Sequence, residues 1–461
     1  MIYFITFVIL YFLHILLKLN VWMVIALGIY AMIMIPMHRK WYHKSVMNQN
    51  RFYEVSLYLD TLLYAFVKEE KVELAVRDVS QTLPEGRLKR LVSKALDYMT
   101  MTFDEVEVLE DALAMIVQEY PCKRVKDAHK FITHVEYYGG EIEKPIGLLL
   151  ADKGRWEKRI KQAIAGRKKQ FVDIILSVIA SLLICGAIIH LPIMDMDISQ
   201  EWLLQIFAFL VIVADDLVIL YGQKYLAVDW IELQLEENEE YYVKKMDSYQ
   251  NYNEKEEKKF SCILGCMGIV ITVCAFVWGN QGLVAATLAL TLFFFYQHRV
   301  GRMLMEKTLT REIKYAFPNW LLDLVLLLQS ENVQVALQKS KEYVPAVLRK
   351  ELHLLTERLE MQPEASEPYH KFLEGFPIPE VHSAMGILYS LSIGNSGNAD
   401  KQISELVEKN LELLDATETE LLKNSASGMY VLFLLPVLTA SFKLVADMVV
   451  LMMHFMQGSM L

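Results

Sequence analysis

The sequence predicts an all-α, polytopic membrane protein with about seven transmembrane helices and two homologous cytoplasmic six-helix bundles. Three observations lead to this prediction: long apolar blocks, an uneven distribution of lysine and arginine around them, and an internal repeat between the two longest polar segments. Of the 461 residues, 54% are hydrophobic, and no segment has the pattern of a convincing β-strand.

Seven apolar blocks are long enough to cross a bilayer. About 20 apolar residues in a helix span the roughly 30 Å hydrocarbon core, and continuous apolar runs indicate helices because backbone polar groups must be satisfied internally there. We do not expect the first block to be a signal peptide, because it lacks a basic n-region and a small-residue cleavage site. The predicted spans are residues 2–17, 21–37, 171–192, 202–221, 260–278, 281–297 and 428–453.

Lysine and arginine indicate how these spans are oriented. Cytoplasmic loops of membrane proteins carry an excess of both residues. Here they cluster after the second span, before the third and after the sixth, whereas the loop 192–201 has none; Lys18 is a mild exception in the first outer turn. We therefore expect a multi-pass protein of the inner (cytoplasmic) cell membrane, with both large polar segments in the cytoplasm. The formal net charge of −10 argues against nucleic-acid binding.

The predicted domains follow from the spans and the orientation. In order they are a transmembrane hairpin (1–37), the first cytoplasmic helical bundle (38–170), a second transmembrane hairpin (171–221), an acidic cytoplasmic connector (222–259), a third transmembrane hairpin (260–297), the second cytoplasmic helical bundle (298–427) and a C-terminal transmembrane helix (428–461).

The two cytoplasmic segments repeat each other. Residues 58–91 align with residues 319–352 without a gap at a constant offset of 261, and Pro84 then falls on Pro345. Apolar residues in both copies recur at three- and four-residue spacing, which is typical of amphipathic helices. Each copy therefore predicts two helical hairpins, a turn and a long last helix that leads into a membrane span.

A glycine-rich break recurs at the same place in both copies. The stretch "YYGGE" (137–141) falls on "SIGNS" (392–396) at an offset of 255, one less than the offset of 256 that relates the preceding helices. Glycine ends helices because it adopts the left-handed conformation without a Cβ penalty, so we expect an ordinary helix corner, with a partner contact at its polar tip as the alternative. The residues of the break are Gly139, Gly140, Glu141, Gly394 and Gly397.

Charged residues inside two predicted spans are the sharpest candidate site. Asp215 and Asp216 lie in the fourth span, and Lys443 and Asp447 lie one turn apart in the last. Carboxylates within a span are costly and indicate a functional site by default. Lys443 can pair with Asp447 in its own helix or with Asp215 or Asp216. The residues could couple helices, contact a substrate helix or relay protons, and polar contacts between spans are the structural alternative.

The sequence contains none of the catalytic motifs that we considered. No GxxxxGK[ST] phosphate loop and no HExxH metal motif is present, and the eleven histidines are scattered. Cys262 and Cys266 are one helical turn apart, but no His or carboxylate accompanies them, so we expect buried thiols that act as small apolar residues. We therefore expect a protein that is not an enzyme and that needs no cofactor or metal.

The second copy, "FPNWLLDLVLLLQSENVQVALQ … LRKELHLLTERL … FPIPEVHSAMGILYSLSIGNSG … QISELVEKN", resembles the type II secretion system F domain of inner-membrane platform proteins. The resemblance covers roughly 303–456 and, more weakly, 50–165. The order of spans and bundles is most similar to the tight-adherence (Tad, or Flp) pilus branch, and the chain looks like two paralogous units joined head to tail. The family's Gly-Glu at the break is matched by Gly140 and Glu141, whereas the second copy has no glutamate there.

The resemblance implies a non-enzymatic platform for assembly of a type IV (Tad/Flp-like) pilus or a secretion pseudopilus. The implied partners are a hexameric cytoplasmic pilus-assembly ATPase, pilin-like subunits and the lipid bilayer, with a homo-oligomer left open. The alternative is a polytopic transporter, or a membrane scaffold or sensor, with helical cytoplasmic domains. Transporter repeats place polar residues and broken helices at the membrane midplane, and only the charged residues of the two spans suggest this.

Overall fold

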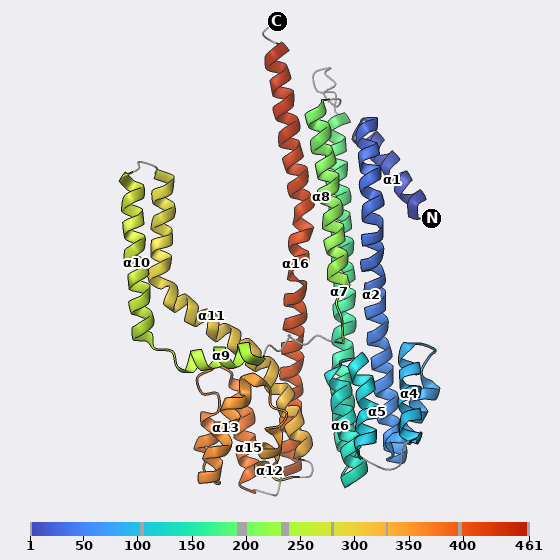
Figure 1. Cartoon of the computed structure of the whole chain (residues 1–461), viewed down its shortest axis with the longest axis vertical. Coiled ribbons are helices and arrows are strands. Elements are labelled where there is room, and N and C mark those ends of the chain that lie inside the picture. Colours follow the sequence, from blue (N-terminus) through green and yellow to red (C-terminus); the bar gives the residue numbers. More distant parts are fainter. Residues whose placement is uncertain are drawn as a thin grey trace. The chain divides into compact units, whose positions relative to one another are not determined.

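The computed structural model describes residues 2–101, 106–190, 201–231, 239–277, 281–328, 331–394 and 399–458, and within these ranges the chain forms helices and no strands (Figure 1). The predicted all-α class is thus confirmed. The chain divides into two compact units. Unit 1 contains Met1–Gly139, Leu149–Leu233 and Thr419–Leu461, and unit 2 contains Gly140–Leu148 and Gln234–Glu418.

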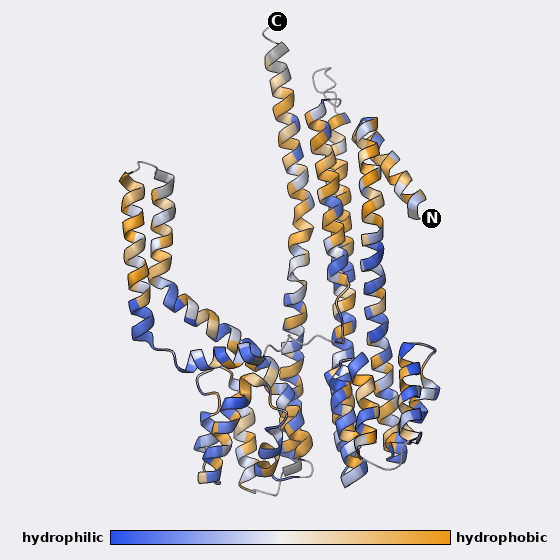
Figure 2. Cartoon of the chain, viewed as in Figure 1, coloured by the Kyte–Doolittle hydropathy of each residue, from blue (hydrophilic) through white to orange (hydrophobic). Residues whose placement is uncertain are grey.

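Five helices in the described part of the chain are long and apolar enough to cross a membrane, as expected for a multi-pass membrane protein. Figure 2 shows the apolar stretches along these helices and their continuation into polar sequence. Two predicted spans are not among the five. The block 2–17 forms the shorter helix α1, and the block 281–297 forms the start of α11, so these two spans stay predictions. The five helices are Val21–Glu69, Glu143–Ala187, Trp202–Leu226, Glu254–Val277 and Lys401–Met453.

Unit 1 combines a polar helical bundle with apolar helices. The helix α2 belongs to both the apolar and the polar part of unit 1, because its first residues are apolar and its last turns pack into the bundle. Its start is capped by Asn20, whose side chain accepts a hydrogen bond from the Met23 N–H at 2.9 Å. The helices that lie wholly in unit 1 are α1 (Ile2–Leu16), α2 (Val21–Glu69), α3 (Val72–Thr82), α4 (Arg87–Met101), α5 (Val106–Glu119), α6 (Lys123–Tyr138) and α8 (Trp202–Leu226). Most of α7 (Glu143–His190) and the C-terminal part of α16 (Ala399–Gly458) also belong to it.

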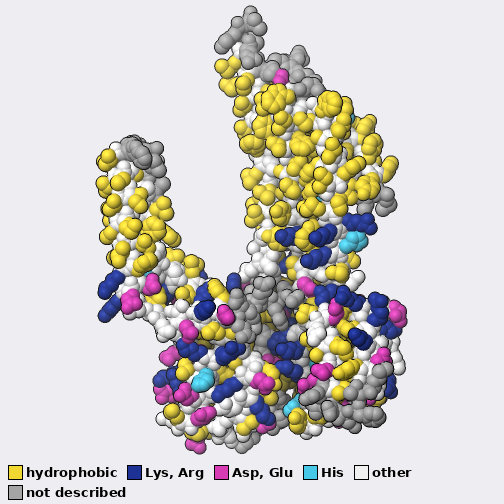
Figure 3. All heavy atoms as spheres, in the orientation of Figure 1, with side chains coloured by type: hydrophobic (Ala, Val, Ile, Leu, Met, Phe, Trp, Pro, Cys, Tyr) yellow, Lys and Arg dark blue, Asp and Glu magenta, His cyan; other side chains and the backbone are white. Residues whose placement is uncertain are grey.

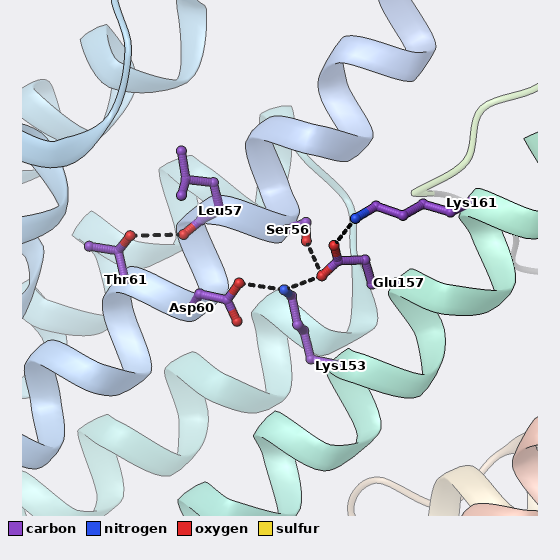
Figure 4. Close-up of polar contacts among 7 residues, drawn as sticks. All are labelled: Ser56, Leu57, Asp60, Thr61, Lys153, Glu157 and Lys161. Atoms are coloured by element: carbon purple, nitrogen blue, oxygen red, sulfur yellow. Dashed lines mark hydrogen bonds and ion pairs between the residues drawn. The ribbon is translucent and has the colours of Figure 1, made fainter.

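An ion network around the buried Lys153 joins α2 to α7 in the bundle of unit 1 (Figure 4). Lys153 is 4% exposed and donates to Asp60 at 2.5 Å and to Glu157. Glu157 also accepts from Ser56 and Lys161. Burial raises the pKa of the Glu157 carboxyl, but the hydrogen bonds from Lys153, Lys161 and Ser56 outweigh burial and lower the pKa to about 2. The Glu157 carboxylate therefore stays charged near neutral pH, and its contacts hold α7 against α2.

A buried histidine in the same bundle makes its stability depend on pH. Tyr58 of α2 and the His129 Nε2 of α6 are 2.7 Å apart and both side chains are buried. Burial disfavours the imidazolium and lowers the pKa of His129 from 6.5 to about 3. The unfolded chain binds a proton on His129 more readily than the folded chain does. The contribution of neutral His129 to the folding stability is therefore fully present above pH 6.5 and is lost as the pH falls toward 3.

We expect the free energy of unfolding of unit 1 to decrease by about 2 kcal/mol between pH 7 and pH 5 through His129 alone. The measurement is the difference in unfolding free energy between the wild type and the double variant Tyr58→Phe/His129→Phe at the two pH values. An identical pH dependence of the two proteins would contradict the assignment.

Unit 2 also combines a polar helical bundle with apolar helices. Its core is rich in aromatic residues: the Trp320 ring lies 5.7 Å from Phe317 and 5.9 Å from Phe372, centroid to centroid, and the Trp320 Nε1 donates to the Ser340 hydroxyl at 3.1 Å. The helices wholly in unit 2 are α9 (Glu239–Gln250), α10 (Glu254–Val277), α11 (Gln281–Leu327), α12 (Val333–Ser340), α13 (Ala346–Met361), α14 (Glu367–Lys371) and α15 (Pro379–Ser392). The N-terminal part of α16 and the first residues of α7 complete the unit.

Side chains of α16 contact the backbone of α11 on both sides of a proline. Pro318 has no N–H for the carbonyl of Lys314 one turn earlier, and the Thr417 hydroxyl of α16, which lies 2.8 Å from the Leu413 carbonyl of its own helix, is 3.3 Å from that carbonyl. The Asn410 side chain donates to the Pro318 carbonyl at 2.9 Å. These contacts join the first and last helices of the bundle.

Small residues on α10 let it pack closely against α11. A Cβ on Gly268 would lie 2.7 Å from the Thr291 hydroxyl, and a Cβ on Gly265 would lie 2.6 Å from the Phe295 ring. The expectation that Cys262 and Cys266 are buried is wrong, since both are exposed. The reason is that the glycines occupy the face of α10 that packs against α11. Figure 3 shows hydrophobic side chains over this hairpin, with charged residues gathered at one end.

Helix starts in the two bundles agree with the offsets of the sequence repeat. The helices α3 and α12 begin at Val72 and Val333, which are 261 residues apart. The helices α6 and α15 begin 256 residues apart, and so do α7 and α16. The two bundles thus share an order of helices as well as a sequence pattern. The last span, however, packs in unit 1, although the repeat places it in the second copy.

Candidate functional site

Asp215 lies where three apolar helices of unit 1 meet. The carboxylate of Asp215, on α8, is 1% exposed. It accepts hydrogen bonds from Ser181 of α7 at 3.1 Å and from Thr439 of α16 at 2.8 Å. Both donors are neutral hydroxyl groups, so the carboxylate links the three helices without an opposite charge. Polar contacts of this kind hold helices together in a low-dielectric environment.

A second contact joins α7 to α16 one helical turn along. Ser177 is four residues before Ser181, so the two serines lie on the same face of α7. Its hydroxyl donates to the Phe433 carbonyl at 2.9 Å. The Thr439 hydroxyl that contacts Asp215 also lies 2.9 Å from the Pro436 carbonyl, and α16 runs as one helix through this proline. We call Ser177, Ser181, Asp215 and Thr439 the polar seam.

Lys443 pairs within its own helix. Its Nζ donates to the Asp447 carboxylate at 2.6 Å, and the two residues are 1% and 5% exposed. Of the alternatives that the sequence leaves open, the structure therefore has the local pair rather than a pair with Asp215 or Asp216. Lys443 lies next to the polar seam, since it follows Thr439 by four residues on the same face of α16.

Asp216 faces a different helix from its neighbour Asp215. Successive residues of an α-helix are rotated by about 100°. Asp216 accepts from the Tyr30 hydroxyl at 2.9 Å and lies 3.2 Å from the His38 Nε2, both on α2. Its side chain is 30% exposed, in contrast to buried Asp215. The two adjacent carboxylates therefore fasten α8 to α2 on one side and to α7 and α16 on the other.

Arg167 is a structural anchor that the sequence analysis missed as a site residue. It is 2% exposed and donates to the Tyr225 carbonyl at 2.8 Å and to the Ser425 hydroxyl at 2.6 Å. Its guanidinium also lies 4.8 Å from the centroid of the Trp230 ring. Burial lowers the pKa of Arg167 to about 10, which leaves it charged at neutral pH. Within the basic run before the third span, only burial distinguishes Arg167 from its exposed neighbours.

The glycines of the break that the structure describes have the positive φ expected of glycine, although Gly139 is not in the left-handed helical region. Gly139 ends α6 with φ 69° and ψ −173°, Gly140 follows with φ 141°, and Gly394 has φ 72° after α15. Glu141 is paired with Lys144 at 3.6 Å, with both side chains about half exposed. Gly397 lies outside the described residues.

We expect Gly139→Ala to lower the stability of the bundle by about 1–3 kcal/mol, because its φ and ψ lie in a region that only glycine populates readily. A Cβ at Gly139 would meet nothing within 4 Å, so the effect comes from the backbone alone. The matched control is Gly147→Ala, a helical glycine that also has nothing within 4 Å and should gain about 0.5–1 kcal/mol. Thermal unfolding in detergent measures both; equal stability of the two variants would contradict the backbone argument.

The polar seam and its neighbours can hold helices together or respond to their movement. In the described part of the chain, no group of three or more His, Cys, Asp or Glu residues is placed to hold a metal ion. Comparisons with protein-family models, with curated proteins and with solved structures found no match.

Proposed function

We propose that the protein is a non-enzymatic inner-membrane platform for assembling a type IV (Tad/Flp-like) pilus or a secretion pseudopilus. It couples a hexameric cytoplasmic assembly ATPase to the movement of pilin-like subunits. In this proposal the chain crosses the membrane seven times and both polar bundles face the cytoplasm.

The observation that carries the proposal is the length and continuity of four helices. The helices α2, α7, α11 and α16 contain 49, 48, 47 and 60 residues. Each runs without interruption between apolar sequence and a polar bundle, and each occupies the first or the last position of its bundle. A continuous helix transmits displacement along its axis, whereas a flexible linker absorbs it.

The energy for subunit movement must come from a partner. Removing about 20 apolar residues from a bilayer at roughly 0.3–0.6 kcal/mol each costs on the order of 6–12 kcal/mol. The sequence has no phosphate-binding loop of the GxxxxGK[ST] type. In the proposal the ATPase moves the bundles, and the long helices carry this movement into the membrane.

The polar seam gives this movement a route between helices. Asp215 ties α8 to α7 and α16, and Asp216 ties α8 to α2. A displacement of α7 or α16 therefore acts on the other apolar helices of unit 1. In the proposal, these contacts change as a pilin helix is lifted.

Aromatic and basic residues support the proposed orientation. Trp41 of α2 lies 5.5 Å from Lys44 and 5.9 Å from Lys224 of α8, ring centroid to Nζ. Tryptophan is enriched at membrane interfaces, and lysine is enriched on the cytoplasmic side. This cluster follows the apolar part of α2 and ends the apolar part of α8, as expected for an inner interface.

Two experiments test the proposal. First, full-length protein isolated from its native membrane should retain an assembly ATPase or a pilin-like subunit; solute uptake by reconstituted liposomes without either partner would favour the transporter alternative. Second, Lys68→Cys and Met361→Cys, each in a variant whose five native cysteines are replaced by alanine, report on the two bundles, since both positions are exposed. A membrane-impermeant maleimide should label them only after the cells are permeabilised. Labelling in intact cells would place a bundle outside and overturn the proposal.

A further inference from the structure

A pocket of about 360 Å³ lies between α7 and α16 in unit 1. Its α7 side includes Arg159, Gly166, Arg167 and Gln170, and its α16 side includes Lys423 and Tyr430. Both helices contribute residues that come just before, or at the start of, an apolar span. This volume is within the range of small-ligand sites.

Among the residues that the structure describes, the pocket is lined by basic ones and by no acidic one. Three lining residues are basic, Arg159, Arg167 and Lys423, and no Asp or Glu is among the described residues that line it. Arg167 is 2% exposed, and its Nε is buried without a hydrogen-bond partner while its other two nitrogens donate to Tyr225 and Ser425. An unsatisfied donor on a buried cation is costly, so the site favours an anionic acceptor.

A second polar residue with an unpaired atom, Gln170, lines the same pocket. The Gln170 Oε1 is buried and also has no partner in the described part of the chain. A ligand that both accepts from a guanidinium and donates a hydroxyl or ammonium proton would satisfy the two unpaired groups. Phospholipid headgroups combine these features, because a phosphate oxygen accepts hydrogen bonds and a glycerol or amine group donates them.

The depth of the pocket matches that of a headgroup. Arg167 lies four residues before Phe171, where the apolar run starts, and this is about 6 Å along the helix. Headgroup regions extend about 5–7 Å beyond the hydrocarbon core on each side. Tyr430 is 63% exposed at the rim, as expected for a tyrosine at the interface. Basic pockets between transmembrane helices bind anionic lipid headgroups.

We propose that this pocket binds the phosphate group of an anionic phospholipid from the surrounding membrane. The phosphate lies against Arg167 and Lys423, and the polar part of the headgroup reaches Gln170. A bound lipid would thereby hold α7 against α16 at the point where both helices enter the membrane.

Two variants probe the pocket without removing the Arg167 anchor. Gly166→Leu fills it, and a Cβ at this position meets nothing within 4 Å, so the change also replaces a poor helix former by a good one. Its control is Gly154→Leu, at another open glycine of α7 outside the pocket. Lys423→Gln removes one cation from the pocket, and Lys168→Gln removes one exposed cation of α7 outside it.

The experiment is native mass spectrometry of the full-length protein in detergent, titrated with phosphatidylglycerol, phosphatidylcholine or inorganic phosphate at constant ionic strength. We expect one phosphatidylglycerol to bind at least tenfold more tightly than phosphatidylcholine. Gly166→Leu should weaken it at least tenfold and Lys423→Gln about fivefold, whereas both controls should bind as the wild type does.

Four results would overturn the proposal. Equal affinity for the two lipids would remove the headgroup specificity, and wild-type binding by Gly166→Leu would place the lipid elsewhere. A loss with Lys168→Gln equal to that with Lys423→Gln would indicate diffuse surface charge. Displacement of the lipid by millimolar inorganic phosphate would identify a soluble phosphate as the ligand and overturn the assignment to a lipid.

Discussion

Replacing Lys443 by methionine is expected to lower the free energy of unfolding by about 3 kcal/mol, because it leaves the Asp447 carboxylate buried without its ion-pair partner. Lys443 donates to the Asp447 Oδ2 at 2.6 Å, and the Asp447 Oδ1 has no hydrogen-bond partner among the described residues. Truncating one member of a buried ion pair lowers the free energy of unfolding by more than the intact pair contributes to it, since the remaining charged group keeps its full desolvation penalty.

The double variant Lys443→Met/Asp447→Leu separates this explanation from simple loss of packing. Replacing both charges by apolar side chains of similar size is often neutral or stabilising, so the double variant should be within about 1 kcal/mol of the wild type. Unfolding of the full chain in mixed micelles, followed by tryptophan fluorescence, measures all three proteins. If the double variant is less stable than Lys443→Met, the pair is not the source of the effect.

Ala165→Pro is expected to reduce filament assembly at least tenfold if the protein is a platform. Ala165 is exposed on α7, between the polar bundle and the apolar stretch. Proline there removes the hydrogen bond to the Lys161 carbonyl and clashes with it, which kinks or breaks a helix at a cost of about 3 kcal/mol or more. The break would uncouple the two parts of α7 without removing a buried side chain.

The control for this experiment is Ala165→Leu, which keeps a good helix former at the same exposed position. Assembly is measured as surface filament in cells that carry the cognate ATPase and pilins, and retention of the ATPase on the purified variant shows that the bundle is intact. Wild-type assembly by Ala165→Pro would refute force transmission through α7.

Much of the fold could be predicted because its determinants are local. Apolar blocks and three- and four-residue spacing predict helices directly, and the repeat register places the starts of α3 and α12 at matching positions. The glycine break was predictable for the same reason, since Gly139 and Gly394 have the positive φ that the residue type indicates.

The partners of the polar seam were not predictable because they depend on packing between distant segments. Asp215 binds Ser181 and Thr439, which are 34 and 224 residues away. Serine and threonine in apolar spans are common and carry no signal by themselves. The local alternative for Lys443 could be named from spacing, but only the packed structure selects it.

The position of two cysteines and the packing of the last span also depend on close contacts between helices. Cys262 and Cys266 were expected inside, but Gly265 and Gly268 allow the closer approach to α11 and leave the thiols outside. The last span follows the second copy of the repeat in sequence, yet it packs with α7 and α8. A sequence repeat does not distinguish these arrangements, because either one leaves the pattern of apolar residues unchanged.

The course of α16 through Pro436 has a mechanical consequence. A helix of 60 residues is about 90 Å long, and its bending stiffness is lowest where proline deprives the Leu432 carbonyl of its main-chain donor. The Ser177 contact to Phe433 and the Thr439 contact to Asp215 lie on either side of that compliant turn. Contacts from α7 and α8 thus brace α16 on both sides of its proline, which restricts bending of the helix at that turn.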